Sequence, residues 1–244
     1  MPPFFIMSNK LLTVFNGATA AFTPASISGL VAWYDFSDAA TLFTDSARTT
    51  AVTADGDAIG GVTDKSGNAN HLSASGTARP TYKTAIKNSK SVARGDGSTD
   101  YLTVSVALGT THAVFVAAKI ATNVVIGQTG ASGYVFYVDA TTVYYRCGTD
   151  LVSVAHGMTL PAWAIIHVVR NGTSVSFYKN GTQIGTTQTL ANNNSFTLAS
   201  VFAKSDGSFA SASDIGETAA YNTNPSAANV SAMLGYLNLK WAVY

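Results

Sequence analysis

The sequence AIIHVVRNGTSVSFYKNGTQIGTTQT, residues 164–189, carries the strongest signal of fold class. Three runs rich in β-branched and aromatic residues are separated by Asn171-Gly172 and Asn180-Gly181. Asn-Gly pairs tolerate the positive φ angles of two-residue type I′ turns, so they join antiparallel strands in tight hairpins. The stretch predicts a three-stranded antiparallel meander.

Short apolar runs broken by turn residues continue on both sides of this meander. They predict further strands at residues 30–35, 101–104, 112–118, 124–128, 133–138, 142–146, 196–199 and 215–221. Residues 41–75 are rich in Asp, Gly, Thr and Ser and predict a long decorated loop with two short strands. A chain of 244 residues suits one large all-β domain.

The pattern changes period near the C-terminus. Asn224 precedes Pro225, which suits an N-cap followed by proline at the first helical position. Apolar residues then recur at spacings of three and four: Val230, Met233, Leu234, Leu237 and Trp241. One amphipathic helix over residues 225–241 is therefore expected to dock on the sandwich by that stripe.

Composition excludes several function classes. The net charge of +1 gives no electrostatic footprint for nucleic acid. No apolar stretch is long enough to span a membrane. The single cysteine, Cys147, allows no internal disulfide and is expected to be a small apolar filler.

Residues 1–23 form an apolar arm ahead of the domain of residues 24–244. A signal peptide is the alternative, but Asn16 and Gly17 interrupt its short apolar core. Exposed in water, the arm would be costly, so we expect it to pack on a partner. Its predicted partner-binding residues are Phe4, Phe5, Ile6, Leu11, Leu12, Val14 and Phe15.

The chain contains one glutamate, Glu217, and twelve aspartates in contexts that mostly resemble turns. Sandwich enzymes that cleave glycosidic bonds use a pair of carboxylates at a fixed separation. The sequence therefore predicts a protein that is not an enzyme, with no catalytic residues.

Residues 64–71 place Asp64, Asn68 and Asn70 within one short loop. A calcium ion could use these three oxygen-bearing side chains, because Ca²⁺ takes six to eight oxygen ligands. The alternative is an Asx-turn loop whose side chains satisfy backbone N–H groups. One acid without a bidentate glutamate favours the turn, so no cofactor is expected.

The adjacent pair Tyr144-Tyr145 must point one ring to each face of a strand. One of the two is therefore exposed and is a candidate for stacking on a sugar. The histidines show no zinc-like spacing, and a structural role is expected for His71, His112, His156 and His167.

Three stretches resemble the concanavalin A-like, laminin-G-type jelly-roll domains of bacterial surface proteins and phage virion proteins. They are residues 27–39, residues 64–102 with the motifs DKSGNANHL and DGSTDYL, and residues 215–241. The insert at residues 41–57 is similar to a variant frequent among tailed-phage structural proteins. The resemblance implies a jelly-roll β-sandwich of two antiparallel sheets, with an N-terminal arm and a C-terminal helix.

The resemblance also implies a place on the outer surface of a virion. The expected function is capsid decoration or cementing, with the major capsid protein or another virion protein as partner, and homo-oligomers such as trimers. The alternative is a glycan-binding adhesin of a head fibre or tail that recognises a host-surface glycan. A glycoside hydrolase or lyase is the least favoured class, and neither nucleic acid nor membrane is an expected partner.

Overall fold

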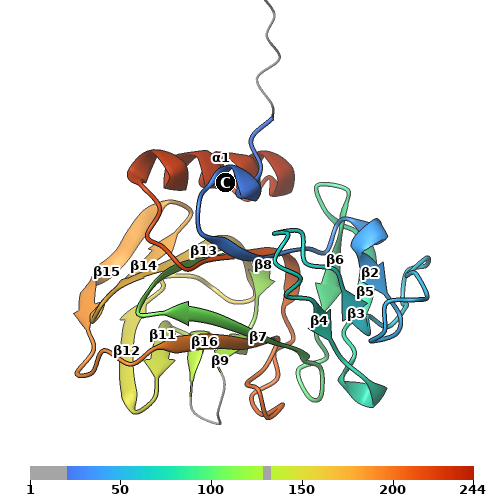
Figure 1. Ribbon diagram of the computed structural model, residues 1–244, viewed down its shortest axis with the longest axis horizontal. Helices are drawn as coiled ribbons and strands as arrows, with labels where there is room; N and C mark the ends of the chain where they lie inside the picture. The colour runs from blue at the N-terminus through green and yellow to red at the C-terminus, as the bar shows by residue number, and fades with distance from the viewer. Residues whose placement is uncertain (1–20, 129–132) are drawn as a thin grey trace, which may run out of the picture.

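The computed structural model describes residues 21–128 and 133–244. Two antiparallel sheets pack face to face, and one C-terminal helix covers the outer side of one of them (Figure 1). The predicted all-β sandwich is confirmed. The seven predicted partner-binding residues of the arm lie outside the described residues.

The first sheet, sheet A, contains the predicted meander. Its strands follow the order β15 (Thr182–Thr189), β14 (Ser174–Lys179), β13 (Ala162–Asn171), β8 (Thr111–Ile120), β17 (Asp214–Tyr221), β6 (Lys90–Arg94) and β5 (Thr81–Lys87), and β1 (Leu30–Asp35) also pairs with β17. Asn180-Gly181 forms the second turn as predicted, with φ of 50° and 84°, but Asn171 belongs to β13 and pairs with Ser174, so the first turn is Gly172-Thr173, one residue later than predicted. The meander signal is therefore confirmed.

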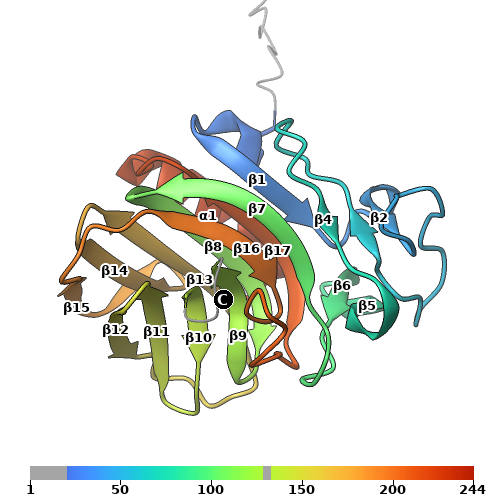
Figure 2. The same cartoon turned by 60° about the horizontal axis from the view of Figure 1, so that its bottom comes forward.

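The second sheet, sheet B, runs in the order β12 (Asp150–Ala155), β11 (Thr142–Cys147), β10 (Tyr134–Val138), β9 (Asn123–Gln128), β16 (Phe196–Val201), β7 (Leu102–Gly109), β4 (Leu72–Ser73), β3 (Gly61–Val62) and β2 (Leu42–Phe43). Figure 2 shows β9 to β12 side by side, with the segment between β16 and β17 folded beside β9. Hydrogen bonds hold that segment there, because Phe202 N donates to Val125 O (2.9 Å) and Asn123 Nδ2 donates to Ala210 O (2.8 Å).

Sequence patterns did not predict β5, β6, β12 or one of the three short strands of the decorated loop. The hairpin of β5 and β6 is rich in lysine and turns at Asn88-Ser89, both with positive φ, so it shows no clear apolar alternation. Strand β12 lies at a sheet edge and alternates only weakly. The decorated loop contains three two-residue strands, β2 to β4, where two were expected.

The core has two compartments. The larger fills the space between the sheets, and the smaller lies between the outer face of sheet A and α1 (Ala227–Trp241). Helix α1 begins two residues later than predicted: Ser226, not Asn224, is the N-cap, and its Oγ accepts from Asn229 N at 3.3 Å. The predicted apolar stripe docks as expected, with Trp241 fully buried. No helix in the described part of the chain is long and apolar enough to cross a membrane.

Candidate functional site

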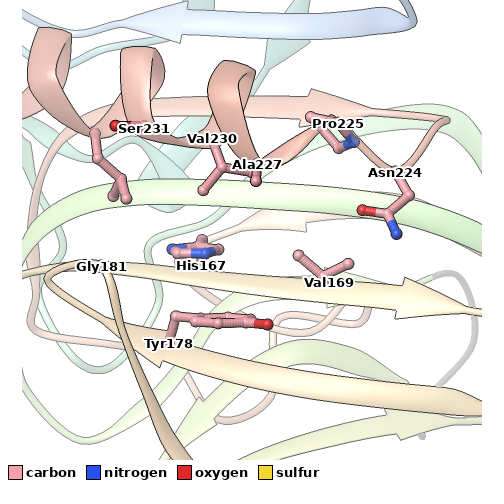
Figure 3. A pocket seen from close by; sticks show the side chains of 10 residues that line it. His167, Val169, Tyr178, Gly181, Asn224, Pro225, Ala227, Val230 and Ser231 are labelled. Carbon is pink, nitrogen blue, oxygen red and sulfur yellow. The ribbon is translucent and has the colours of Figure 1, made fainter.

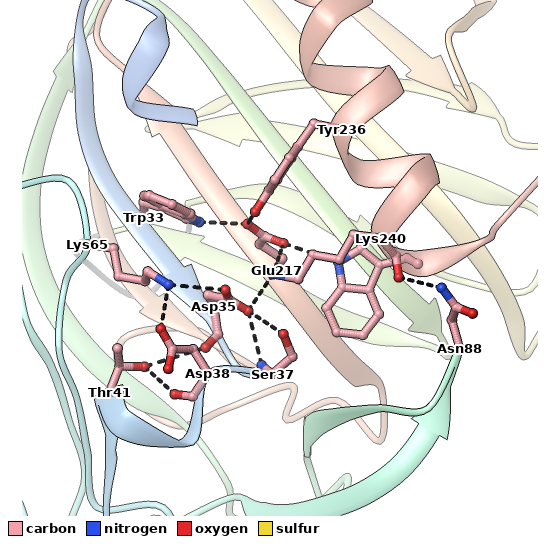
Figure 4. A network of polar contacts seen from close by, with 11 residues as sticks. Trp33, Asp35, Ser37, Asp38, Thr41, Lys65, Asn88, Glu217, Tyr236 and Lys240 are labelled. Atoms are coloured by element: carbon pink, nitrogen blue, oxygen red, sulfur yellow. Dashed lines mark hydrogen bonds and ion pairs between the residues drawn. The ribbon is translucent and has the colours of Figure 1, made fainter. Parts of the chain in front are cut away.

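Glu217 is a fully buried acceptor beneath α1 (Figure 4). Its Oε1 accepts from Trp33 Nε1 at 2.7 Å and from the Tyr236 hydroxyl at 2.9 Å. Its Oε2 accepts from Lys240 Nζ at 2.8 Å and from Trp241 Nε1 at 3.2 Å. The only glutamate therefore ties three residues of the helix and one of β1 to strand β17.

The carboxylate of Asp35 belongs to the same network. Lys240 Nζ lies 2.7 Å from Asp35 Oδ1 and is thus shared between Asp35 and Glu217, while Lys65 bridges Asp35 at 3.3 Å and Asp38 at 2.5 Å. Burial raises the pKa of Glu217. Burial also acts to raise the pKa of Asp35, but Lys240 outweighs it and the pKa lies below its ordinary value. Both carboxylates are enclosed by donors, which is a structural arrangement.

The loop of Asp64 uses its oxygens internally. Asp64 Oδ1 accepts from the backbone N–H groups of Trp33 and Ser66, and Oδ2 accepts from Asn70 N and Ser66 Oγ, at 2.6–3.0 Å. The amides of Asn68 and Asn70 donate to carbonyls of β1, Leu30 O and Val31 O. This is the Asx-turn alternative, and it fastens the loop to β1.

No group of three His, Cys, Asp or Glu side chains is placed to hold a metal ion within residues 21–128 and 133–244. His71 Nδ1 accepts from Asp64 N at 3.0 Å, so it serves the same loop.

The pair Tyr144-Tyr145 divides between the two faces of sheet B as the alternation predicts. Tyr145 is fully buried in the core, where its hydroxyl accepts from Arg170 Nη1 at 2.9 Å and lies 3.4 Å from His112 Nε2. Tyr144 lies on the outer face, where its hydroxyl donates to Asp139 Oδ2 at 2.7 Å. Only Tyr144 is available to a ligand.

Tyr144 belongs to an aromatic cluster on the outer face of sheet B. Its ring centroid lies 5.2 Å from that of Tyr137, its cross-strand partner on β10. Tyr137 contacts Tyr134 at 5.4 Å and meets Phe209 edge to face at 5.7 Å and 89°. We call Tyr137, Tyr144 and Phe209 the platform; Tyr134 lies buried beside it.

Phe209 is the most exposed member of the platform. Phe209 is 49% exposed, although it is a bulky apolar residue. Its φ of 58° is in the left-handed region, where a residue with a Cβ pays a conformational cost of about 1–2 kcal/mol. An exposed aromatic ring held in an unfavourable backbone conformation points to a binding role.

A separate pocket of about 440 Å³ lies between the start of α1 and strands β13 and β14 (Figure 3). His167 and Tyr178 form its floor, with rings stacked at 4.3 Å and 3°. His167 is 1% exposed, and its Nδ1 has no hydrogen-bond partner among the described residues. Val169, Val230 and Leu234 make the remaining wall largely apolar.

The other predicted structural residues are enclosed. His112 is fully buried, His156 Nδ1 accepts from Met158 N at 3.0 Å, and Cys147 is a buried free thiol. These placements agree with the structural roles expected for them.

Solved structures with the same fold include proteins in complex with carbohydrates. Domain 4 of AbnA, an extracellular GH43 arabinanase from Geobacillus stearothermophilus in complex with arabinotriose, matches with a TM-score of 0.52 and 13% identity, over 86% of this chain and 98% of that one. A GH54 α-L-arabinofuranosidase matches with a TM-score of 0.58 and 13% identity, over 88% of this chain and 65% of that one. Trypanosoma rangeli sialidase in complex with sialic acid matches with a TM-score of 0.50 and 10% identity, over 91% of this chain and 34% of that one.

At these identities the likeness concerns the fold alone. The chain spans nearly all of the arabinanase domain but about a third of the sialidase. No family model and no curated protein matches the sequence.

Sequence reasoning identified Tyr144 but missed two of its neighbours. The alternation of β10 does not reveal Tyr137, because a register shift between Phe136 and Tyr137 interrupts it. Phe209 carried a usable signal, because it is a lone aromatic residue within a turn-forming run, SDGSFASAS.

Proposed function

We propose that this chain is a non-catalytic carbohydrate-binding domain displayed on a phage virion, and that the platform is its sugar-binding surface. The observation that carries the proposal is the cluster of Tyr137, Tyr144 and Phe209 on an open sheet face. Aromatic rings offer large, rigid, amphipathic surfaces on which sugar rings can stack.

Two further observations support this reading. The fold is shared with domain 4 of AbnA, which was solved in complex with arabinotriose, so a sandwich of this kind is compatible with sugar binding. The enclosure of Glu217 and Asp35 supports the non-catalytic part, because neither carboxylate is free to act on a bound sugar. The virion setting rests on the sequence resemblance.

The test is binding of the free, purified protein to an array of bacterial surface polysaccharides and arabino-oligosaccharides, followed by calorimetry on the best ligand. Tyr137→Ala, Tyr144→Ala and Phe209→Ala should each weaken binding about tenfold, or about 1.4 kcal/mol. Tyr244→Ala is the matched control, because Tyr244 is an exposed aromatic residue outside the platform. Equal losses in all four variants, or none, would contradict the proposal.

The same ligand also tests for catalysis. Prolonged incubation of the bound glycan should release no new reducing ends. Sustained release that disappears on changing one acid would show an enzyme instead.

Capsid decoration is the second candidate, and the apolar character of residues 1–20 favours it. A decoration protein should bind assembled capsids and ignore the array. A deletion of the arm tests this candidate. It must keep Phe22, since this residue packs on Tyr236 of α1 with ring centroids 6.0 Å apart. A chain lacking residues 1–20 should therefore fold but fail to join the capsid.

A further inference from the structure

Lys204 is a buried cation at the edge of the platform. The residue is 8% exposed, and its Nζ lies 3.8 Å from the ring centroid of Phe209. No ion pair or hydrogen bond of Nζ occurs within the described residues. The ammonium rests on the ring by a cation–π contact and has no anionic partner among the described residues, which leaves it able to pair with an incoming anion.

Arg146 brings a second positive charge to the same place. It stands opposite Tyr134 in the register of β10 and β11, and Tyr134 in turn contacts Tyr137. Burial lowers the pKa of Lys204, Asp206 acts against this, and Arg146 adds to the lowering. The positive charge of Arg146 thus disfavours the charged form of Lys204.

The acids around the platform are already occupied. Asp139 accepts from Thr141 N, Thr142 N and the Tyr144 hydroxyl, and Asp206 accepts from Ser208 N and Oγ. Neither acid forms an ion pair in the described structure.

Two other cations with little exposure have oxygen partners. Lys240 pairs with Asp35 and Glu217, and Arg170 donates from Nε, Nη1 and Nη2 to three oxygens. Lys204 differs from both, and it lies beside the exposed aromatic ring of Phe209.

We propose that the ligand of the platform is an acidic saccharide, and that Lys204 and Arg146 hold its carboxylate or sulfate while Tyr137, Tyr144 and Phe209 stack on its rings. This rests on the proposed function and names its ligand class. An anion over Lys204 supplies the missing acceptor and removes the repulsion from Arg146, so the positive pair favours acidic over neutral sugars.

The experiment uses matched pairs of probes on the full chain. Oligogalacturonate is compared with a galacto-oligosaccharide of equal length, and dextran sulfate with dextran. At least one acidic member should bind tenfold or more tightly than its neutral partner, and added salt should weaken only the acidic member. The carboxylate and sulfate arms tell the two acidic groups apart.

Variants separate charge from packing. Lys204→Met removes the charge from an unbranched side chain and should abolish the preference for the acidic member, and Arg146→Leu should reduce it. Lys90→Met is the control, because Lys90 is an exposed cation beside the C-terminal part of α1. It should leave the preference for acidic members unchanged. Thermal melts of each variant show that it is folded.

The outcomes distinguish the two proposals. Equal binding of acidic and neutral members through the platform, or an undiminished preference in Lys204→Met, overturns the acidic ligand and leaves the proposed function standing. No binding of any saccharide, here or on the array, overturns the proposed function itself.

Discussion

The outer faces of the two sheets carry similar side chains with opposite outcomes. On sheet A, α1 covers Glu217 and Trp33, and its own Tyr236 and Trp241 donate to the Glu217 carboxylate, so that this charge is fully paired inside the protein. On sheet B, Tyr137, Tyr144 and Phe209 gather with no covering element, and Lys204 lacks an acceptor among the described residues. A cluster of aromatic and charged side chains is therefore a candidate binding site only where the rings stay exposed and the charge has no partner in the described structure.

The comparison predicts that substitutions on sheet A cost stability and substitutions on sheet B cost binding. Trp241→Ala should have the largest effect on stability, lowering the free energy of unfolding by roughly 3–5 kcal/mol, because it empties a buried site beside Gly216 and Trp163. Chemical denaturation measures it. Tyr244→Ala, the exposed control, should stay within about 0.5 kcal/mol.

Glu217→Gln should come next, at about 3 kcal/mol, because it removes one partner of a buried ion pair and turns an amide N–H₂ toward existing donors. Asp206→Asn, on an exposed turn, is the matched control. A stability equal to wild type would mean that Glu217 does not hold the helix.

Asp64→Ala should lower the free energy of unfolding by roughly 1–3 kcal/mol, because it leaves donors of β1 and its own loop without acceptors. If the Asx turn is the whole role, a chelator should leave the melting temperature of wild type unchanged. A calcium-restored shift that is absent from Asp64→Ala would establish a metal site.

His167 predicts a pH dependence on sheet A. Burial lowers its pKa to about 4, against about 6.5 in an unfolded chain, so only the unfolded state gains this proton as pH falls from 6.5 toward 4, and stability declines. Phenylalanine suits the stack with Phe115 and Tyr178 and does not titrate. Between pH 7 and 5, wild type should lose about 2 kcal/mol more than His167→Phe.

His112 provides the background for that experiment. Burial lowers its pKa to about 3, so it destabilises wild type and His167→Phe alike in acid. Identical slopes of stability against pH in the two proteins would contradict the assignment to His167.

The smallest effect is expected on sheet B, with the opposite sign. Phe209→Asn should raise the free energy of unfolding by up to about 1 kcal/mol, because asparagine tolerates the left-handed backbone better. The same variant should weaken sugar binding. A loss of stability above 1 kcal/mol would mean that Phe209 serves the fold.

Local patterns in the sequence were sufficient for much of this structure. The meander, the C-terminal helix with its buried stripe and the division of Tyr144 from Tyr145 all follow from periods of two and 3.6 and from turn chemistry. These features depend on neighbours close in the chain, so the sequence alone determines them.

The candidate site required the tertiary structure. Tyr137, Tyr144, Lys204 and Phe209 come from β10, β11 and the segment before β17, and only the pairing of β9 with β10 and β16 brings them together. The same is true of Glu217: its isolation in the sequence argued against a carboxylate pair, but the fold places Asp35 of β1 beside it, with Lys240 of α1 shared between the two. Whether a side chain is satisfied or left open depends on contacts across tens of residues, and local sequence does not encode those contacts.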